Sequence, residues 1–242
     1  MKKRILGKTG LEVSVFGFGG IALDGLPQKV ADELVAEAVD RGVNFFDVGP
    51  TYGEAQEKLG PALEPYRLEV KLACKTEPDK SKLEVREDLE NSLKLLRTDY
   101  FDIYQLHEVT TDEDVEKALA PGGALEAIDE AKRKGLLRFA GFSAHTEKAA
   151  LALIESYDFD TVLFPVNFNC WLNRGMGKQV LTEAEERNMG RMAIKALAKR
   201  NWYGDEEQGK TWYRPITDNH KLARAALKFT LSQSVHLAMS PG

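Results

Sequence analysis

Short apolar runs recur along the chain and alternate with longer stretches in which apolar residues return every three or four positions. We count eight such runs, beginning at Val13, Val43, Glu69, Phe101, Leu136, Thr161, Arg191 and Ser234. Several are too continuously apolar for a strand with one solvated face. They therefore predict parallel strands that are buried on both faces.

Amphipathic helical patterns lie between these runs. They cover residues 27–42, 82–98, 123–135, 147–157, 177–190 and 218–233, the last beginning at Asp218 or Asn219 as N-cap. The buried faces predicted for the first two helices comprise Val30, Leu34, Val35, Ala38 and Val39, and Leu83, Val85, Leu89, Leu93 and Leu96.

The alternation of strand and helix predicts an α/β fold of the (β/α)8 barrel type, a TIM barrel. An open doubly wound sheet is the rival, but the glycines after the first strand lack the G-x-G-x-x-G spacing typical of that fold. The chain shows no linker, so we expect one domain over residues 1–242. We also expect an N-terminal β-hairpin around Gly7 and Gly10. The eighth strand stands close to Gly242, so a C-terminal segment is expected to be missing.

Composition narrows the function classes. The formal net charge of −5 and the absence of a Lys/Arg run argue against a nucleic-acid-binding protein. The two cysteines, Cys74 and Cys170, form no metal-binding spacing. The N-terminus does not resemble a signal peptide, and no apolar run is long enough to span a membrane. We expect a cytoplasmic protein without membrane or nucleic-acid partners.

Polar residues at the ends of the predicted strands are the candidate functional residues, because barrel enzymes place their chemistry there. Asp47 and Tyr52 follow the second strand, Lys75 ends the third and His107 ends the fourth. A phenol can protonate a carbonyl oxygen, and a lysine cation lowers the phenol pKa from its usual value of about 10. A carboxylate holds the lysine, and a neutral imidazole orients the carbonyl. Together the four residues suit carbonyl reduction.

Each of these residues, taken alone, also fits a role without chemistry. Asp47 could cap a turn, Tyr52 could be an exposed loop aromatic, and His107 could be a core histidine. Lys71 shares the strand parity of Lys75 but stands at the strand's start. The combination at three successive strand ends favours the catalytic interpretation.

The chain resembles the aldo-keto reductase family over nearly its whole length. The resemblance rests on "ILGKTGLEVSVFGFGG", "GVNFFDVGPTYG", "KLACKT", "YFDIYQLHE", "GLLRFAGFSAH" and "SVHLAMSPG". It implies a (β/α)8 barrel, NADPH as the cofactor, a small carbonyl substrate, and a catalytic tetrad formed by Asp47, Tyr52, Lys75 and His107. The preference for NADP over NAD comes from the resemblance alone.

The resemblance also implies cofactor-binding residues. They are Ser143, Asn167, Lys195, Ser240 and Gly242. Ala144 stands where the family has an asparagine, so His145 could take over its contact, and Asn169 competes with Asn167. Lys195 stands where the family often has an aromatic residue. Lys199 and Arg200 could meet the pyrophosphate or be solvated charges.

Two other functions stay open. Some family members serve as channel subunits, so the chain could be a cofactor-binding regulatory or scaffold subunit, although an intact tetrad argues against that. An electron-transfer reductase with an iron–sulfur tail is a third option, which Cys74 and Cys170 alone could not support.

The segment 199–218 is long for a connection between a strand and a helix, and we expect a lid over cofactor or substrate there.

Overall fold

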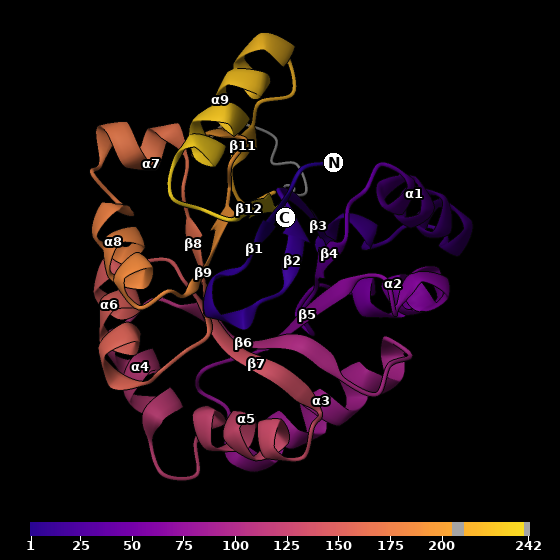
Figure 1. Cartoon of the computed structure of the whole chain (residues 1–242), viewed down its shortest axis with the longest axis vertical. Helices are drawn as coiled ribbons and strands as arrows, with labels where there is room; N and C mark the ends of the chain where they lie inside the picture. Colours follow the sequence, from indigo (N-terminus) through magenta and orange to yellow (C-terminus); the bar gives the residue numbers. More distant parts are fainter. Residues whose placement is uncertain (205–210, 240–242) are drawn as a thin grey trace.

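The computed structural model describes residues 1–204 and 211–239. Eight parallel strands close into a barrel in the order β12, β3, β4, β5, β6, β7, β8, β9, with helices around the outside (Figure 1). The barrel strands are β3 (Phe16–Gly19), β4 (Phe45–Asp47), β5 (Lys71–Thr76), β6 (Phe101–Val109), β7 (Leu137–Ala144), β8 (Thr161–Pro165), β9 (Gly190–Ile194) and β12 (Leu237–Met239). The predicted (β/α)8 barrel is confirmed.

The helices follow the strands in the expected alternation. They are α1 (Gln28–Asp40), α2 (Ala55–Leu63), α3 (Lys82–Leu95), α4 (Asp112–Leu119), α5 (Ala124–Arg133), α6 (Glu147–Ser156), α7 (Phe168–Asn173), α8 (Lys178–Glu186) and α9 (His220–Ser232), with short 3-10 turns at η1 (Gly7–Thr9), η2 (Gly20–Leu23) and η3 (Glu64–Tyr66). None of the helices within residues 1–204 and 211–239 is both long enough and apolar enough to cross a membrane.

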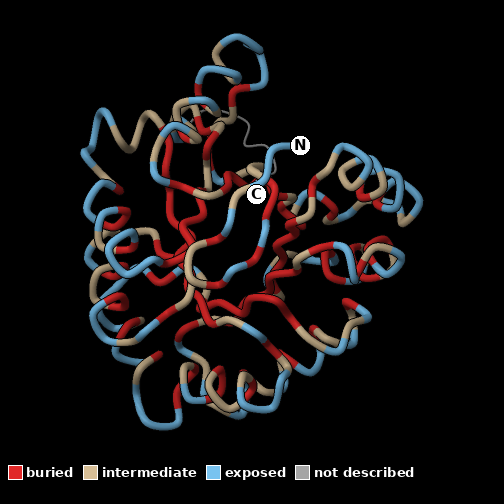
Figure 2. Tube along the Cα trace, viewed as in Figure 1, coloured by how far each residue is buried: buried red, intermediate tan, exposed pale blue. Residues whose placement is uncertain are grey.

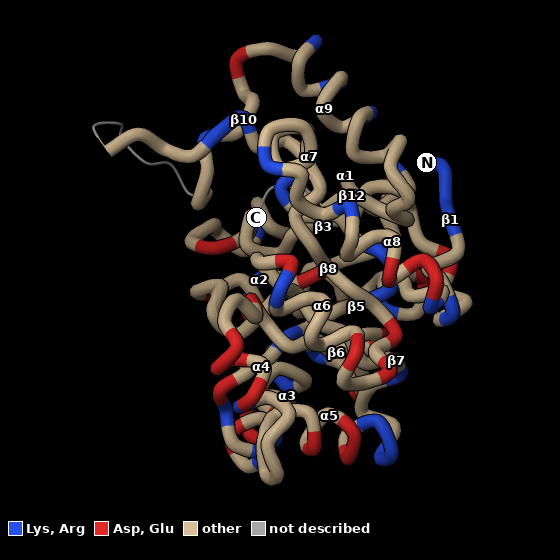
Figure 3. Tube along the Cα trace, turned by 90° about the vertical axis from the view of Figure 1, so that its left-hand side faces the viewer, with Lys and Arg blue, Asp and Glu red and all other residues tan. Residues whose placement is uncertain are grey.

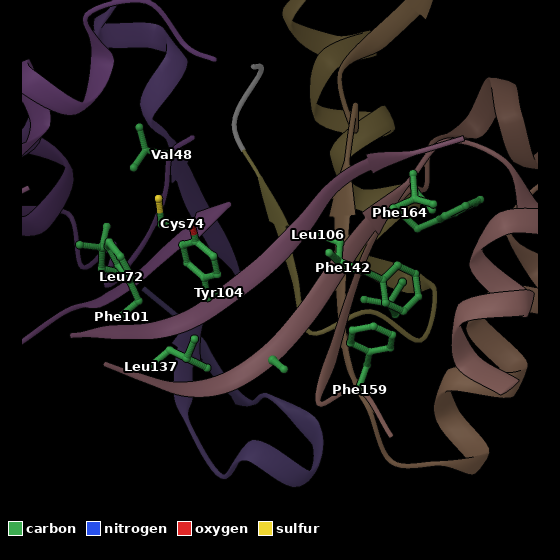
Figure 4. Close-up of a cluster of buried hydrophobic side chains, with 14 of the residues drawn as sticks. Val48, Leu72, Cys74, Phe101, Tyr104, Leu106, Leu137, Phe142, Phe159 and Phe164 are labelled. Atoms are coloured by element: carbon green, nitrogen blue, oxygen red, sulfur yellow. The ribbon is translucent and has the colours of Figure 1, made fainter. Parts of the chain in front are cut away.

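Two apolar layers hold the barrel together. The outer layer lies between the strands and the helices, where Leu72, Tyr104, Phe142 and Phe164 gather with their neighbours (Figure 4). The inner layer fills the barrel itself and includes Phe45. Figure 2 shows the result, with buried strands at the centre and exposed helix surfaces outside. Burial on both faces explains why the strands are apolar without alternation.

The predicted N-terminal hairpin is present and closes one end of the barrel. Strands β1 (Lys3–Ile5) and β2 (Glu12–Ser14) pair antiparallel, and they cross the barrel centre in Figure 1. Leu6, within the hairpin, packs in the inner layer and approaches Gly190, the first residue of β9. The hairpin therefore covers the end where the strands begin and leaves the opposite end for the site.

The predicted helix faces were partly wrong. Val30 and Leu34 of α1 are 37% and 38% exposed, and Leu83 of α3 is 61% exposed, whereas Ala31 and Val35 are buried. Helix α1 packs mainly against α2 and buries Ala31 and Val35, so its covered face is narrower than its apolar face. At α9, Asn219 is the N-cap, since its side chain accepts a hydrogen bond from the Leu222 amide.

The segment predicted to be a lid contains a small hairpin. Strand β10 (Ala198–Arg200) pairs antiparallel with β11 (Arg214–Pro215). In Figure 3, the stretch labelled β10 is coloured blue for basic residues. Elsewhere in that view, acidic and basic residues are mixed. The middle of the segment, 205–210, lies outside the described residues, so the lid stays a prediction.

Candidate active site

A cavity of about 580 Å³ opens at the end of the barrel where the strands finish. Asp47, Tyr52, Lys75 and His107 all line it, although they come from three different strand ends and stand up to 60 positions apart in the chain. The structure therefore brings the four predicted catalytic residues together in one hollow. Such a hollow with convergent polar groups is typical of a small-molecule site.

A buried ion pair forms the floor of the site. The Nζ of Lys75 donates to the Oδ2 of Asp47 and lies 3.5 Å from the Val48 carbonyl oxygen. Strand pairing sets this contact, because Asp47 of β4 is in register with Ala73 of β5, two residues before Lys75. Burial alone would lower the pKa of Lys75, but the Asp47 carboxylate and, after it, Tyr52 together outweigh burial, so the pKa is raised and the cation is held.

Tyr52 stands on the turn that follows β4. Gly53 makes this turn possible: its φ is +54°, and a Cβ there would lie 2.2 Å from the Oδ1 of Asp24. The Tyr52 ring centre lies 4.9 Å from the Nζ of Lys75. Burial raises the pKa of Tyr52, and the nearby Lys75 cation opposes this only in part. The phenol is therefore protonated at neutral pH, as a proton donor must be.

His107 faces Tyr52 across the cavity. Its Nε2 lies 3.5 Å from the Tyr52 hydroxyl, and the two rings meet edge to face at 5.6 Å. Burial, followed by the charge of Lys75, lowers the pKa of His107 to about 3. The imidazole is therefore neutral at ordinary pH. It can donate a hydrogen bond but cannot serve as the acid in this range.

Comparison with known proteins identifies the family. Residues 15–235 match the model of the Aldo/keto reductase family. This chain belongs to the aldo/keto reductase family. It is 32% identical over 157 residues to the "Uncharacterized oxidoreductase YqkF" of Bacillus subtilis, an alignment that covers 60% of this chain and 49% of that protein.

Two further proteins are similar to this chain. It is 30% identical over 134 residues to the "Probable voltage-gated potassium channel subunit beta" of Arabidopsis thaliana, covering 49% of this chain and 41% of that one. The solved structure of an aldo-keto reductase from Bacillus halodurans, in its holo form, has a TM-score of 0.75 at 24% identity, covers 99% of this chain and 85% of its own, and shows the fold. The chain spans about half the length of the curated relatives that it matches.

Ser143, expected from the family to hold the cofactor, is engaged within this aldo/keto reductase barrel. Its Oγ accepts a hydrogen bond from the Glu108 amide at 2.7 Å and is 3.4 Å from the Leu106 carbonyl oxygen. Glu108 has a φ of +57°, an unfavourable conformation for a glutamate, and the β6–β7 register shifts there. Ser143 thus supports the irregularity that directs His107, and its cofactor role stays a prediction.

Asn167 is buried and caps helix α7. Its Oδ1 accepts hydrogen bonds from the amides of Asn169 and Cys170 at 3.0 and 2.9 Å. It lines a smaller hollow of about 170 Å³ beside the main cavity, as does Asn169. The Asn167 oxygen is therefore already used by the helix, and contact with a cofactor stays a prediction.

Lys195 joins the two hollows. It lines both of them, together with His145 and Trp212. Burial lowers the pKa of Lys195, and its φ is +61°. Burial, followed by the charge of Lys195, lowers the pKa of His145 to about 4. Ser240 and Gly242, the remaining predicted cofactor residues, lie outside the described residues.

Gln105 was missed in the sequence. It stands on β6, two positions before His107, and is fully buried. Its Nε2 donates to the Oδ1 of Asp47 at 3.0 Å. The only signal was a polar amide inside the apolar run "FDIYQLHEV", at the parity of His107 and therefore directed into the barrel.

Proposed function

We propose that this chain is a nicotinamide-dependent oxidoreductase that reduces aldehydes or ketones to alcohols. One observation carries the proposal: a neutral imidazole and a protonated phenol, 3.5 Å apart, share a cavity with a buried lysine–carboxylate pair. A carbonyl oxygen placed between the Tyr52 hydroxyl and the His107 Nε2 could accept a hydrogen bond from each.

The residues of this chain fit an anionic, amide-bearing cofactor. Lys195 is a half-buried cation whose side chain has no hydrogen-bond or ion-pair partner among the described residues, and it faces both hollows. Lys195 and His145 would hold the cofactor at the junction, with Ser240 and Gly242 as further candidates. When bound, the nicotinamide supplies a hydride to the carbonyl carbon. The preference for NADPH over NADH rests on the family resemblance.

The chain's own residues would deliver the proton. His107 donates a hydrogen bond from Nε2 and fixes the carbonyl oxygen. The Tyr52 hydroxyl then gives its proton to that oxygen. The phenolate left behind is stabilised by the Lys75 ammonium, and Asp47 keeps that ammonium charged and in place.

The basic residues of β10, Lys199 and Arg200, are also candidates for binding the phosphate groups of the cofactor. Lys199 lies 3.3 Å from the carboxylate of Asp218, and the Arg200 guanidinium stacks 3.7 Å above the Tyr203 ring. A phosphate would have to compete with Asp218 for Lys199. We therefore assign the first cofactor contact to Lys195 rather than to Lys199.

A regulatory or scaffold subunit is the second candidate, since two similar proteins are described as probable channel subunits. Turnover separates the two functions. Purified protein is mixed with NADPH or NADH and a panel of aldehydes and ketones, and the nicotinamide absorbance is followed. Loss of absorbance with alcohol formation supports the oxidoreductase, whereas cofactor binding without turnover of any substrate supports the subunit.

A further inference from the structure

Gln105 touches the catalytic ion pair without lining the cavity. It lies in the middle of β6, is fully buried and is not among the residues that border the hollow. Its Nε2 lies 3.0 Å from the Oδ1 of Asp47. It can therefore act on the chemistry only through Asp47.

The contact fixes the orientation of the Asp47 carboxylate. Oδ2 accepts from Lys75, and Oδ1 accepts from Gln105, so each oxygen has its own donor. A carboxylate held at one oxygen only can turn about its terminal bond, and the lysine that it holds would move with it. With both oxygens held, the Lys75 ammonium stays 4.9 Å from the centre of the Tyr52 ring.

Strand register brings Gln105 to this position. Lys75, Gln105, Gly141 and Thr161 follow one another across β5, β6, β7 and β8 as paired residues, and paired residues share a face. Gly141 gives room, because a Cβ there would lie 3.2 Å from the Cγ of Gln105 and 2.2 Å from the Oγ1 of Thr161. These four paired residues therefore face the barrel interior, and Gln105 stands next to the lysine of the ion pair.

A contribution to folding stability does not explain why a glutamine side chain stands at position 105. Among the residues that the structure describes, the Oε1 of Gln105 is buried without a hydrogen-bond partner, as is the Oγ1 of Thr161. An unpartnered buried oxygen is a cost to folding that a methionine or leucine would not carry. The polarity of the contact also settles the amide orientation, because only the Nε2 side can donate to a carboxylate.

We propose that Gln105 is a positioning residue for proton transfer: by holding Asp47, it keeps Lys75 aligned with Tyr52 and sets how readily the phenol ionises. This rests on the proposed function of Tyr52 as proton donor. Loss of the amide frees the carboxylate, the ammonium shifts away from the phenol, and the Tyr52 pKa rises because the cation that opposes burial lies farther from the hydroxyl.

Two variants test the proposal. Gln105→Met keeps the length of the side chain and removes the donor, so kcat should fall about 10-fold or more at every pH, with little change in KM. Gln105→Glu places a second carboxyl group beside Asp47, and the pair retains a shared proton at moderate pH. Its protonated form can donate as the amide does. Its kcat should therefore approach that of the wild type near pH 6 and fall as the pH rises.

Tyr104→Phe is the matched control. Tyr104 precedes Gln105 on β6 and is equally buried, but it faces the outer core (Figure 4). It should leave kcat and its pH profile unchanged. Wild-type kcat in Gln105→Met would overturn the proposal. So would an equal, pH-independent loss in the Met and Glu variants accompanied by a lowered melting temperature, since that outcome indicates a purely structural role.

A measurement without cofactor keeps this test separate from the proposed function. The ionisation of Tyr52 is followed by NMR of ring-labelled tyrosine, with Tyr52→Phe identifying the signal. A higher Tyr52 pKa in Gln105→Met than in the wild type and Tyr104→Phe supports the positioning role, even if no substrate is turned over. An unchanged Tyr52 pKa contradicts it, whatever the enzyme's activity.

Discussion

Asp47 and Lys75 depend on each other at the residue scale. Both are nearly inaccessible to solvent, and each is the principal counter-charge of the other. Removing one charge from such a pair is costly because the other is left buried without compensation. Function and stability are therefore coupled at this pair.

Lys75→Met should lower the free energy of unfolding by about 3–5 kcal/mol, because the Asp47 carboxylate loses its cation. Urea denaturation measures the change. Lys71→Met is the matched control, since Lys71 begins the same strand and is only partly buried; it should cost less than about 1 kcal/mol. In Asp47→Asn/Lys75→Met, the cost should be smaller than the sum of the two single costs. Equal losses for the two lysines, or additive losses for the pair, would show that the ion pair is not coupled as described.

Strand parity was enough to predict some contacts between residues but not others. Lys75 could be preferred over Lys71 because only the strand's end opens at the cavity, and this choice rested on position alone. Gln105 could not be assigned, since an amide in a buried strand has no known partner until the neighbouring strand is placed. For Ser143, the hydrogen-bond partner could not be predicted either, since it is a backbone amide on another strand.

At the element scale, the end of β6 controls where His107 points. Glu108 adopts a φ of +57°, and its amide is held by the Ser143 hydroxyl of β7. A residue in this conformation persists only when its surroundings support it. The position of His107 therefore depends on a neighbouring strand.

Ser143→Ala should lower kcat about 10-fold with a less than about twofold change in the KM of the cofactor, because it releases the Glu108 amide and shifts His107. Steady-state kinetics with varied NADPH measures both values. Ser143→Thr retains the hydroxyl and serves as the control, with the larger kcat of the two variants. A raised KM with an unchanged kcat would instead assign Ser143 to cofactor binding, as the family resemblance implies.

Helix periodicity predicted the existence of elements better than their buried faces. The range 27–42 contains α1, but Val30 and Leu34 are more exposed than the pattern suggested. Periodicity shows that a face is apolar, whereas the width of the face that is covered depends on which neighbouring elements pack against it. Helix α4 was not predicted, although its N-cap Thr111 and the carboxylate of Asp114 form a capping box.

Acid should destabilise the whole molecule early in a titration. Burial lowers the pKa of His107 to about 3 and those of His145 and His236 to about 4. The unfolded chain binds these protons near pH 6.5, while the folded protein does not. The free energy of unfolding is therefore constant for these groups above about pH 6.5 and falls as the pH decreases from there toward 4.

Urea denaturation at pH 7, 6 and 5 measures this dependence. The triple variant His107→Gln/His145→Gln/His236→Gln should show a flatter profile than the wild type, because most carboxylates titrate at lower pH. His220→Gln, a change at an exposed position, is the control. An unchanged slope in the triple variant would mean that other groups set the acid sensitivity.

The barrel as a whole was predictable because eight doubly buried strands are a strong pattern. Closure of the barrel then fixed which strand ends meet, and it brought Asp47, Tyr52, Lys75 and His107 into one cavity. The hairpin plug was also expected from Gly7 and Gly10. Strand register and the irregular end of β6 were not, since both depend on contacts between distant segments.

The Tyr52→Phe variant is the sharpest test of the proton-donor assignment. The rate of aldehyde reduction is measured in a single turnover with saturating NADPH, and cofactor affinity is measured separately by fluorescence. If the Tyr52 hydroxyl delivers the proton, the rate should fall by about 10²–10⁴-fold with nearly unchanged cofactor affinity, since a ring without a hydroxyl preserves the packing against Lys75 and His107. A Tyr52→Phe enzyme that reduces aldehydes at the wild-type rate would show that the proton comes from another group.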